Sequence, residues 1–338
     1  MFFANVACEK CGFALGFLPE KLTMLALVPP NGTNGAGQAN MQAASGRQDH
    51  WRFCENATYG ACNWLLPADD ASPLCQACRL NDIIPDLSDP DNLNAWQRFE
   101  RAKKRLIYSL LRFGLPFDAS DAGALTFNLG HDTMTGHLDG RISVDIMEAD
   151  AVERERRRQH FDEPFRTMLG HLRHESGHFY WNVLIDAASR HDDFRQLFGD
   201  ERADYGEALQ QHHDAGPPVG WQDAYVSAYA SSHPWEDWAE TWAHYLHMVD
   251  ALETAEVMGI EPRSAGLKRA AARPLEARDV YAEKTFDVLR DRWLPLTIAL
   301  NALNRSMGHD DFYPFIIPPV GYEKLAFVHS AIRARSVR

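Results

Sequence analysis

The distribution of cysteines constrains the fold of this chain more than any other feature of its sequence. All 6 cysteines lie within the first 78 of its 338 residues, which separates a Cys-rich module from a Cys-free remainder. Pro85-Asp-Leu-Ser-Asp-Pro90 has the composition of a linker between the two parts. We therefore expect a zinc-ribbon-like domain at residues 1–85 and a second domain at residues 91–338, a division that chain length permits.

Two cysteine pairs have the spacing of zinc knuckles, Cys8-Glu-Lys-Cys11 and Cys75-Gln-Ala-Cys78. Four thiolates form a closed tetrahedral zinc site. No basic and then apolar signal peptide precedes Cys8, so we expect a cytoplasmic protein whose reduced thiols bind metal. The first choice of ligands for one structural zinc is Cys8, Cys11, Cys75 and Cys78. Cys54 and Cys62 are alternative ligands that could replace either pair.

The Cys-free part carries a second metal-binding pattern, His174-Glu175-Ser176-Gly177-His178. Apolar residues around it, including Leu172 and Phe179, have the spacing of a partly buried helix. On a helix, His174 and His178 share one face and can offer two imidazoles to a single metal ion. Glu175 is then placed to take a proton from water on the open side of that ion.

A later segment offers the carboxylate that would complete this site. Pro234 marks a helix start, and Trp238 and Trp242 begin an aromatic stripe at helical spacing. Glu236 and Glu240 lie one turn apart on the same face. One can bind metal while the other accepts the N–H of a ligand histidine. Acids in a first turn also favour the helix dipole, but that explanation leaves Glu240 unaccounted for.

The block Glu236-Asp-Trp-Ala-Glu240 after the HExxH pattern resembles the gluzincin metallopeptidases, particularly the lethal-factor type. The resemblance implies that Glu236 is the third zinc ligand, with Trp238 in place of the usual phenylalanine. It also implies that Tyr229, seven residues before Glu236, contacts the substrate oxyanion.

Over nearly its whole length the chain is similar to zinc-binding metallopeptidases that carry an N-terminal zinc ribbon. The residues that carry this similarity are Cys62-Asn-Trp-Leu-Leu-Pro, Cys75-Gln-Ala-Cys78-Arg-Leu-Asn, Ile84-Pro-Asp-Leu-Ser-Asp-Pro, Phe198-Gly-Asp-Glu-Arg-Ala-Asp-Tyr205 and Asn304-Arg-Ser-Met-Gly308. Members of that family have another CxxC knuckle upstream of the one at Cys8. Either the true start lies upstream of Met1 or this chain has lost one metal site.

Further patterns predict an α+β fold. Residues 93–113 have helical periodicity, and a short β section follows them, in which Asp139-Gly140 separates two apolar runs as in a hairpin. From residue 151 onward the pattern is mostly helical, as expected for a gluzincin-like domain with a small sheet.

A formal net charge of -13 makes a nucleic-acid partner unfavourable. No apolar run approaches the roughly 18 residues that a membrane helix needs.

Together these features predict a zinc-dependent hydrolase, more specifically a peptidase, with one catalytic and one structural zinc. His174, His178 and Glu236 would hold the catalytic zinc, Glu175 and Tyr229 would act on a peptide or protein substrate, and Glu240 would orient a ligand histidine. Two alternatives stay open. One is a non-catalytic protein whose ribbon binds a protein or nucleic-acid partner, and the other is a hydrolase that acts on a non-peptide amide.

Overall fold

The computed structural model describes residues 3–28, 41–44, 50–119, 123–131, 133, 135–149, 167–260 and 279–336. The chain forms two compact units. The first comprises Met1–Arg112 with Ala124–Leu172, and the second comprises Phe113–Gly123 with Arg173–Arg338. The boundary expected near residues 85–91 lies inside the first unit. The zinc-ribbon region therefore shares a unit with the helix and the sheet that follow it.

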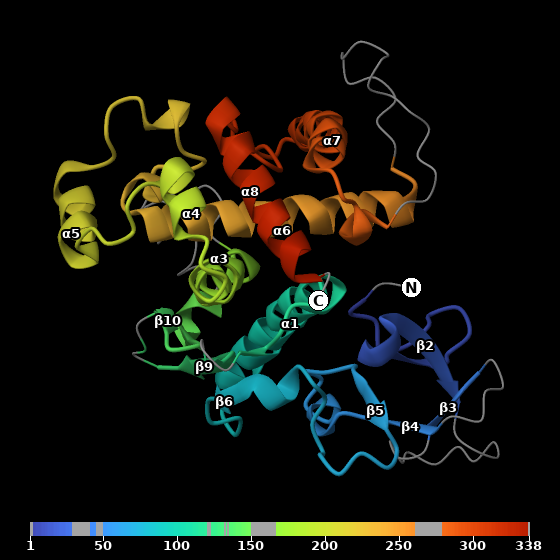
Figure 1. Ribbon diagram of the computed structural model, residues 1–338. Coiled ribbons are helices and arrows are strands. Elements are labelled where there is room, and N and C mark those ends of the chain that lie inside the picture. Colours follow the sequence, from blue (N-terminus) through green and yellow to red (C-terminus); the bar gives the residue numbers. More distant parts are fainter. Residues whose placement is uncertain are drawn as a thin grey trace. The chain divides into compact units, whose positions relative to one another are not determined.

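The first unit begins with a five-stranded antiparallel sheet of order β1-β2-β3-β4-β5 (Figure 1). Its strands are β1 (Ala14–Leu18), β2 (Thr23–Val28), β3 (Met41–Ala43), β4 (His50–Phe53) and β5 (Leu65–Pro67). Buried side chains from all five strands form its small core, namely Leu18, Leu27, Met41, Trp51 and Leu65. The β4–β5 ladder ends where Phe53 pairs with Leu65, so the chain enters and leaves the connecting loop at neighbouring positions.

A second, four-stranded sheet has the order β10-β11-β9-β6. Its strands are β6 (Asn81–Ile83), β9 (Thr126–Gly130), β10 (Gly136–Leu138) and β11 (Arg141–Asp145). The predicted hairpin is confirmed: β10 and β11 are antiparallel, and Asp139 and Gly140 between them have φ of 49° and 83°, as a tight two-residue turn requires. β6 pairs in parallel with β9, so the end of the Cys-rich region is part of this sheet.

Helix α1 (Pro90–Arg112) belongs to the same unit and confirms the helix predicted over residues 93–113. It begins slightly earlier, because Asp89 accepts a hydrogen bond from the backbone N–H of Asp91 at 2.8 Å and caps the first turn. A short two-stranded ladder, β7 (Asp118–Ala119) with β8 (Gly123–Ala124), follows α1.

The second unit is built around the long helix α6 (Pro234–Met258), which starts at Pro234 as predicted. Helices α4 (His191–Phe198), α7 (Phe286–Ser306) and α8 (Pro319–Ser336) pack against α6 (Figure 1). Two further helices are α3 (Met168–Trp181), which belongs to this unit from Arg173 onward and is continued by a π-helical turn at Asn182–Asp186, and α5 (Tyr205–Ala215). The α+β class predicted from the sequence is confirmed. Among the described helices, none has the length and apolar character needed to cross a membrane.

Candidate metal centres

Helices α3 and α6 approach each other closely at the HExxH sequence. A Cβ on Gly177 would lie 2.9 Å from Ala239 Cα, so a side chain there would push the helices apart. The Trp238 indole donates to the Gly177 carbonyl at 2.8 Å, and the Trp242 indole donates to Ser176 Oγ at 3.0 Å. The two variable positions of the motif thus fix α3 against α6, a function that sequence spacing alone did not reveal.

This contact brings together the three expected ligands. One nitrogen each of His174 and His178 and one carboxylate oxygen of Glu236 all lie within 4.8 Å of one another. Glu236 Oε2 lies 3.0 Å from His174 Nε2, and Glu236 Oε1 lies 3.5 Å from His178 Nε2. Glu236 is 1 % exposed, and its buried Oε2 has no hydrogen bond. A buried carboxylate whose two oxygens each face a ligand imidazole, one of them without a hydrogen bond, fits a metal cation, because buried charge needs a partner.

Glu240 contacts His174 at the ring nitrogen opposite the one that faces Glu236. Its Oε1 lies 2.7 Å from His174 Nδ1, and its Oε2 accepts a hydrogen bond from Ser227 Oγ, also at 2.7 Å. When the ring is neutral, an Nδ1–H donated to Glu240 leaves the lone pair on His174 Nε2, the nitrogen that faces Glu236. Burial opposes a positive charge on His174, but the two glutamates outweigh it and raise the pKa of this histidine well above its usual range.

The other titratable groups have pKa values shifted by burial and by neighbouring charges. Burial lowers the pKa of His178 to about 4, so this ring is neutral at pH 7. Burial opposes the charge of Glu236, but His178 and His174 outweigh it and lower its pKa to about 2. Burial raises the pKa of Glu175 to about 7. A carboxyl group with that pKa can both accept and release a proton near neutral pH.

Two tyrosines border the site. The Tyr229 ring centroid lies 5.9 Å from that of His174, and burial raises the pKa of the Tyr229 phenol, which therefore keeps its proton. Tyr205 donates a hydrogen bond from its hydroxyl to Glu236 Oε1 at 2.6 Å. Tyr205 was not predicted as a site residue. It occurs in a segment quoted for the family resemblance, but no motif spacing connects it with Glu236.

A second cluster of candidate ligands lies in the first unit. Sulfurs of Cys54, Cys62, Cys75 and Cys78 all lie within 4.8 Å of one another, and all four side chains are buried. Backbone N–H groups of Trp64 and Cys75 point at the sulfurs of Cys62 and Cys54, at 3.4 and 3.3 Å. Burial raises the pKa of Cys62 and Cys75 well above the usual range. Four buried thiols with converging sulfurs fit a closed structural zinc site.

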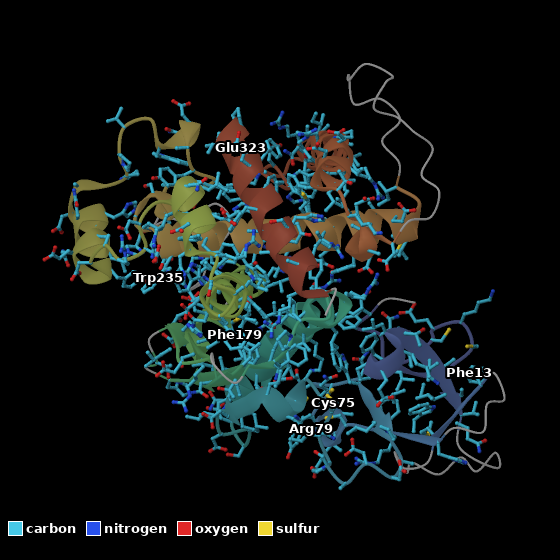
Figure 2. All side chains as sticks on the ribbon, in the orientation of Figure 1. Phe13, Cys75, Arg79, Phe179, Trp235 and Glu323 are labelled. Atoms are coloured by element: carbon cyan, nitrogen blue, oxygen red, sulfur yellow. The ribbon has the colours of Figure 1, made fainter. Side chains whose placement is uncertain are left out.

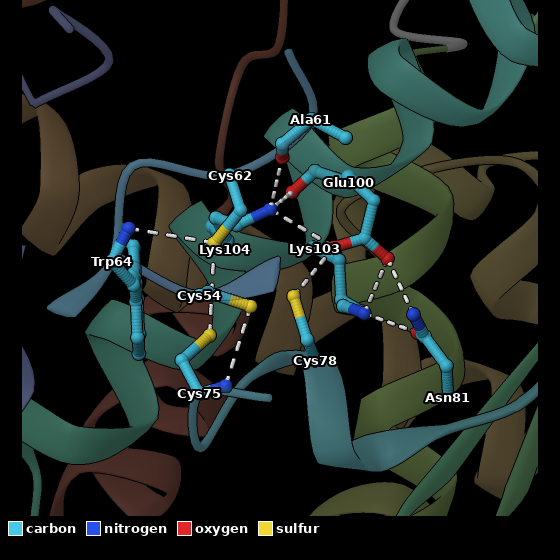
Figure 3. A network of polar contacts seen from close by, with 10 residues as sticks. All are labelled: Cys54, Ala61, Cys62, Trp64, Cys75, Cys78, Asn81, Glu100, Lys103 and Lys104. Carbon is cyan, nitrogen blue, oxygen red and sulfur yellow. Dashed lines mark hydrogen bonds and ion pairs between the residues drawn. The ribbon is translucent and has the colours of Figure 1, made fainter. Parts of the chain in front are cut away.

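Helix α1 lines this cluster with charged side chains (Figure 3). Glu100 Oε2 accepts from Lys104 Nζ at 2.9 Å and lies 3.6 Å from Cys78 Sγ, while Glu100 Oε1 accepts from Lys103 Nζ at 2.5 Å. Lys104 also donates to the Ala61 carbonyl at 2.5 Å. Burial opposes charge on Lys104, but Glu100 outweighs it and raises the pKa of the ammonium group. Two buried cations can balance the negative charge of zinc-bound thiolates.

The structure corrects the first choice of thiol ligands. Cys8 and Cys11 share a turn in which the Gly12 N–H donates to the Cys8 carbonyl at 2.8 Å, but neither belongs to the cluster with Cys75 and Cys78. Within the described part of the chain, candidate ligands gather only in the thiol cluster and in the His174 site. Cys54 and Cys62 join Cys75 and Cys78 because they flank the β4–β5 loop, where the Cys54 N–H donates to the Trp64 carbonyl at 3.0 Å.

Comparison with known families finds one match in each part of the chain. A family described as "Putative zinc-binding metallo-peptidase" matches residues 92–331, and a zinc-ribbon domain matches residues 1–89. The chain belongs to this zinc-binding metallo-peptidase family and carries the zinc ribbon at its N-terminal end.

Relatives of similar length occur in mycobacteria. Uncharacterized proteins of Mycobacterium bovis and Mycobacterium tuberculosis are 42% identical over 338 residues, covering 98% of this chain and 91% of each relative. No solved structure matches the chain.

Proposed function

We propose that the second unit is a zinc-dependent peptidase. The observation that carries this proposal is the combination of the ligand group His174, His178 and Glu236 with Glu175, a buried carboxyl group whose pKa is raised to about 7. A purely structural metal site has no need for such a group. Three protein ligands also leave a coordination position open, which is typical of catalytic zinc.

Zinc held by these residues would polarise a substrate carbonyl and lower the pKa of a nearby water molecule. Glu175 takes a proton from the attacking water and returns it to the leaving amine. Glu240 keeps the His174 ring in place through the 2.7 Å contact with Nδ1. The Tyr229 phenol, which keeps its proton, donates to the oxygen that gains negative charge during attack.

Glu175→Gln tests this proposal, because an amide cannot accept the proton but preserves the size of the side chain. We expect hydrolysis of a peptide library, followed by mass spectrometry, to fall by about 10²–10⁴-fold. Zinc content per chain should stay the same. Glu323→Gln is the matched control, since Glu323 is exposed on α8 (Figure 2). Peptide cleavage by Glu175→Gln at the wild-type rate would refute the assigned role.

Two other functions are separated by the same experiment. Activity on small amides without cleavage of any peptide would indicate a non-peptide substrate. Zinc uptake without any hydrolysis would favour a binding protein. In that case the ribbon, with its exposed Cys11 and half-buried Cys8, would be the part that contacts a protein partner. Glu175 argues for catalysis over the binding reading, since a binding site gains nothing from a buried proton acceptor next to the metal ligands.

A further inference from the structure

Helix α5 contributes to the metal centre although none of its residues is buried. Asp204 caps the helix by accepting a hydrogen bond from the Glu207 N–H at 2.8 Å. Two of its side chains reach the site. Tyr205 hydrogen bonds Glu236, and the His212 ring lies 6.1 Å from the Tyr229 ring. Because α5 adds no buried side chain to the core, packing alone does not explain its position, and its contacts with the site suggest a function there.

Tyr205 is held against the start of α6 by a second set of contacts. His233 accepts the Trp235 N–H on Nδ1 at 3.1 Å, and its Nε2 lies 3.2 Å from the Ala203 carbonyl oxygen, two residues before Tyr205. Because Nδ1 accepts a hydrogen bond and Nε2 faces a carbonyl oxygen, the ring proton is on Nε2. His233 thus connects the residues that precede α5 to the first turn of α6 through two hydrogen bonds. The Tyr205 ring packs on His233 and Trp235 at 5.2 and 5.9 Å. The packing of the Tyr205 ring therefore orients its hydroxyl toward Glu236.

The two oxygens of Glu236 have different environments. Oε1 accepts the Tyr205 hydroxyl at 2.6 Å and lies 3.5 Å from His178 Nε2. Oε2 is buried, has no hydrogen bond and lies closer to its imidazole, 3.0 Å from His174 Nε2. We propose that Tyr205 is a positioning residue of the metal centre, which holds Oε1 so that Oε2 is presented to the metal. This inference rests on the proposed metal site but not on the identity of the substrate.

The physical reason is that a carboxylate can rotate and bind a metal through one oxygen or both. A strong hydrogen bond to Oε1 favours binding through Oε2 alone, which keeps a coordination position open for water or substrate. Loss of such a supporting contact costs metal affinity, typically by about 10–100-fold. Tyr205→Phe removes only the hydroxyl and preserves the ring that packs on His233 and Trp235, so the variant should fold.

The test measures metal binding rather than turnover. Metal-free protein is titrated with zinc in competition with a chromophoric chelator, and separately with Co²⁺, whose visible absorption reports coordination at the histidine site. We expect Tyr205→Phe to bind zinc at the histidine site about 10–100-fold more weakly, with an altered Co²⁺ spectrum. Tyr229→Phe should preserve zinc affinity while lowering turnover. Tyr59→Phe, in the ribbon, is the control for loss of an exposed tyrosine hydroxyl.

Unchanged zinc affinity and an unchanged Co²⁺ spectrum in Tyr205→Phe would overturn the inference, even if the wild-type protein cleaves peptides. A wild-type protein that binds zinc but cleaves nothing would refute the peptidase proposal alone, because the effect of Tyr205 on affinity is read without substrate. Equal losses of affinity in Tyr205→Phe and Tyr229→Phe would also overturn it, because the effect would then be general to hydroxyl groups around the site.

Discussion

The two candidate metal centres differ most in the charges that surround them. In the first unit, the four thiols of Cys54, Cys62, Cys75 and Cys78 lie beside the ammonium groups of Lys103 and Lys104. In the second unit, the ligand histidines lie beside carboxylates, with Glu240 at 2.7 Å from His174 Nδ1. Zinc with four thiolates is a dianion, whereas zinc with two neutral imidazoles and one carboxylate is a cation. Each centre is therefore surrounded by charge of the opposite sign.

This difference indicates different functions for the two metals. Four buried thiolates complete the coordination of a zinc ion, so the thiol centre has no room for a substrate. Three candidate ligands would leave a position open at the histidine centre, and Glu175 beside it is a buried carboxyl group with a raised pKa. The thiol centre should therefore determine whether the first unit folds, and the histidine centre should determine what the second unit does.

The largest expected effect separates folding from catalysis. Cys75→Ser should unfold the ribbon, because structural zinc contributes about 10–16 kcal/mol in small zinc domains. His178→Ala should abolish hydrolysis but leave the ribbon folded and one zinc bound. Hydrogen exchange over residues 50–83 measures whether the ribbon is folded, and zinc content per chain measures how many ions each variant binds. A folded ribbon in Cys75→Ser would show that the thiol cluster is not a metal centre.

The next largest effect tests the cations around the thiol centre. Lys104→Met removes a buried ammonium group and leaves Glu100 near Cys78, which should destabilise the first unit by about 3–5 kcal/mol. Chemical denaturation of the zinc-loaded protein measures the loss. The exposed Lys10→Met is the control. The double variant Lys104→Met/Glu100→Gln should recover part of the stability, and a double variant no better than the single one would contradict the charge argument.

Local sequence signals predicted those parts of the molecule whose structure depends on a few neighbouring residues. Asp139-Gly140 gave the hairpin because both residues adopt positive φ without difficulty, and Pro234 gave the start of α6. Helical spacing also predicted that His174 and His178 share one helix face and that Glu236 and Glu240 share another, and the resemblance to gluzincin metallopeptidases selected Glu236 as the third ligand of the group that the structure brings together. The one-turn spacing of Glu236 and Glu240 predicted a contact between Glu240 and a ligand histidine, which in the structure is His174.

Features that depend on tertiary packing were not predictable in this way. Cys54 and Cys62 do not form a CxxC pair, and only the pairing of β4 with β5 brings them to Cys75 and Cys78. Tyr205 reaches Glu236 from a separate helix, so no local spacing connects them. A glycine in the middle of an expected helix, Gly177, was the one local sign of the close approach between α3 and α6.

A smaller effect is expected at the contact that orients His174. Glu240→Gln keeps the size of the side chain but replaces a charged acceptor with a neutral amide. Zinc affinity at the histidine centre should fall by about 10–100-fold, and affinity at the thiol centre should not change. Competition with chelators of graded strength measures both affinities in one titration. Equal losses at the two centres would mean that the variant acts through general destabilisation rather than through His174.

The smallest effect is a difference in how pH changes metal affinity. The raised pKa of His174 means that this residue is protonated at pH 7 in the metal-free protein, whereas the lowered pKa of His178 keeps it neutral. Binding at the histidine centre should therefore displace about one proton, and affinity should rise about tenfold per pH unit until the pH passes the pKa of His174.

At the thiol centre, burial raises the pKa of both Cys62 and Cys75, so at least about two protons must leave and the pH dependence should be steeper. Calorimetric titrations in buffers with different ionisation enthalpies count the protons released. A shallower pH dependence at the thiol centre than at the histidine centre would mean that Cys62 and Cys75 are already ionised without metal, and would contradict their raised pKa values.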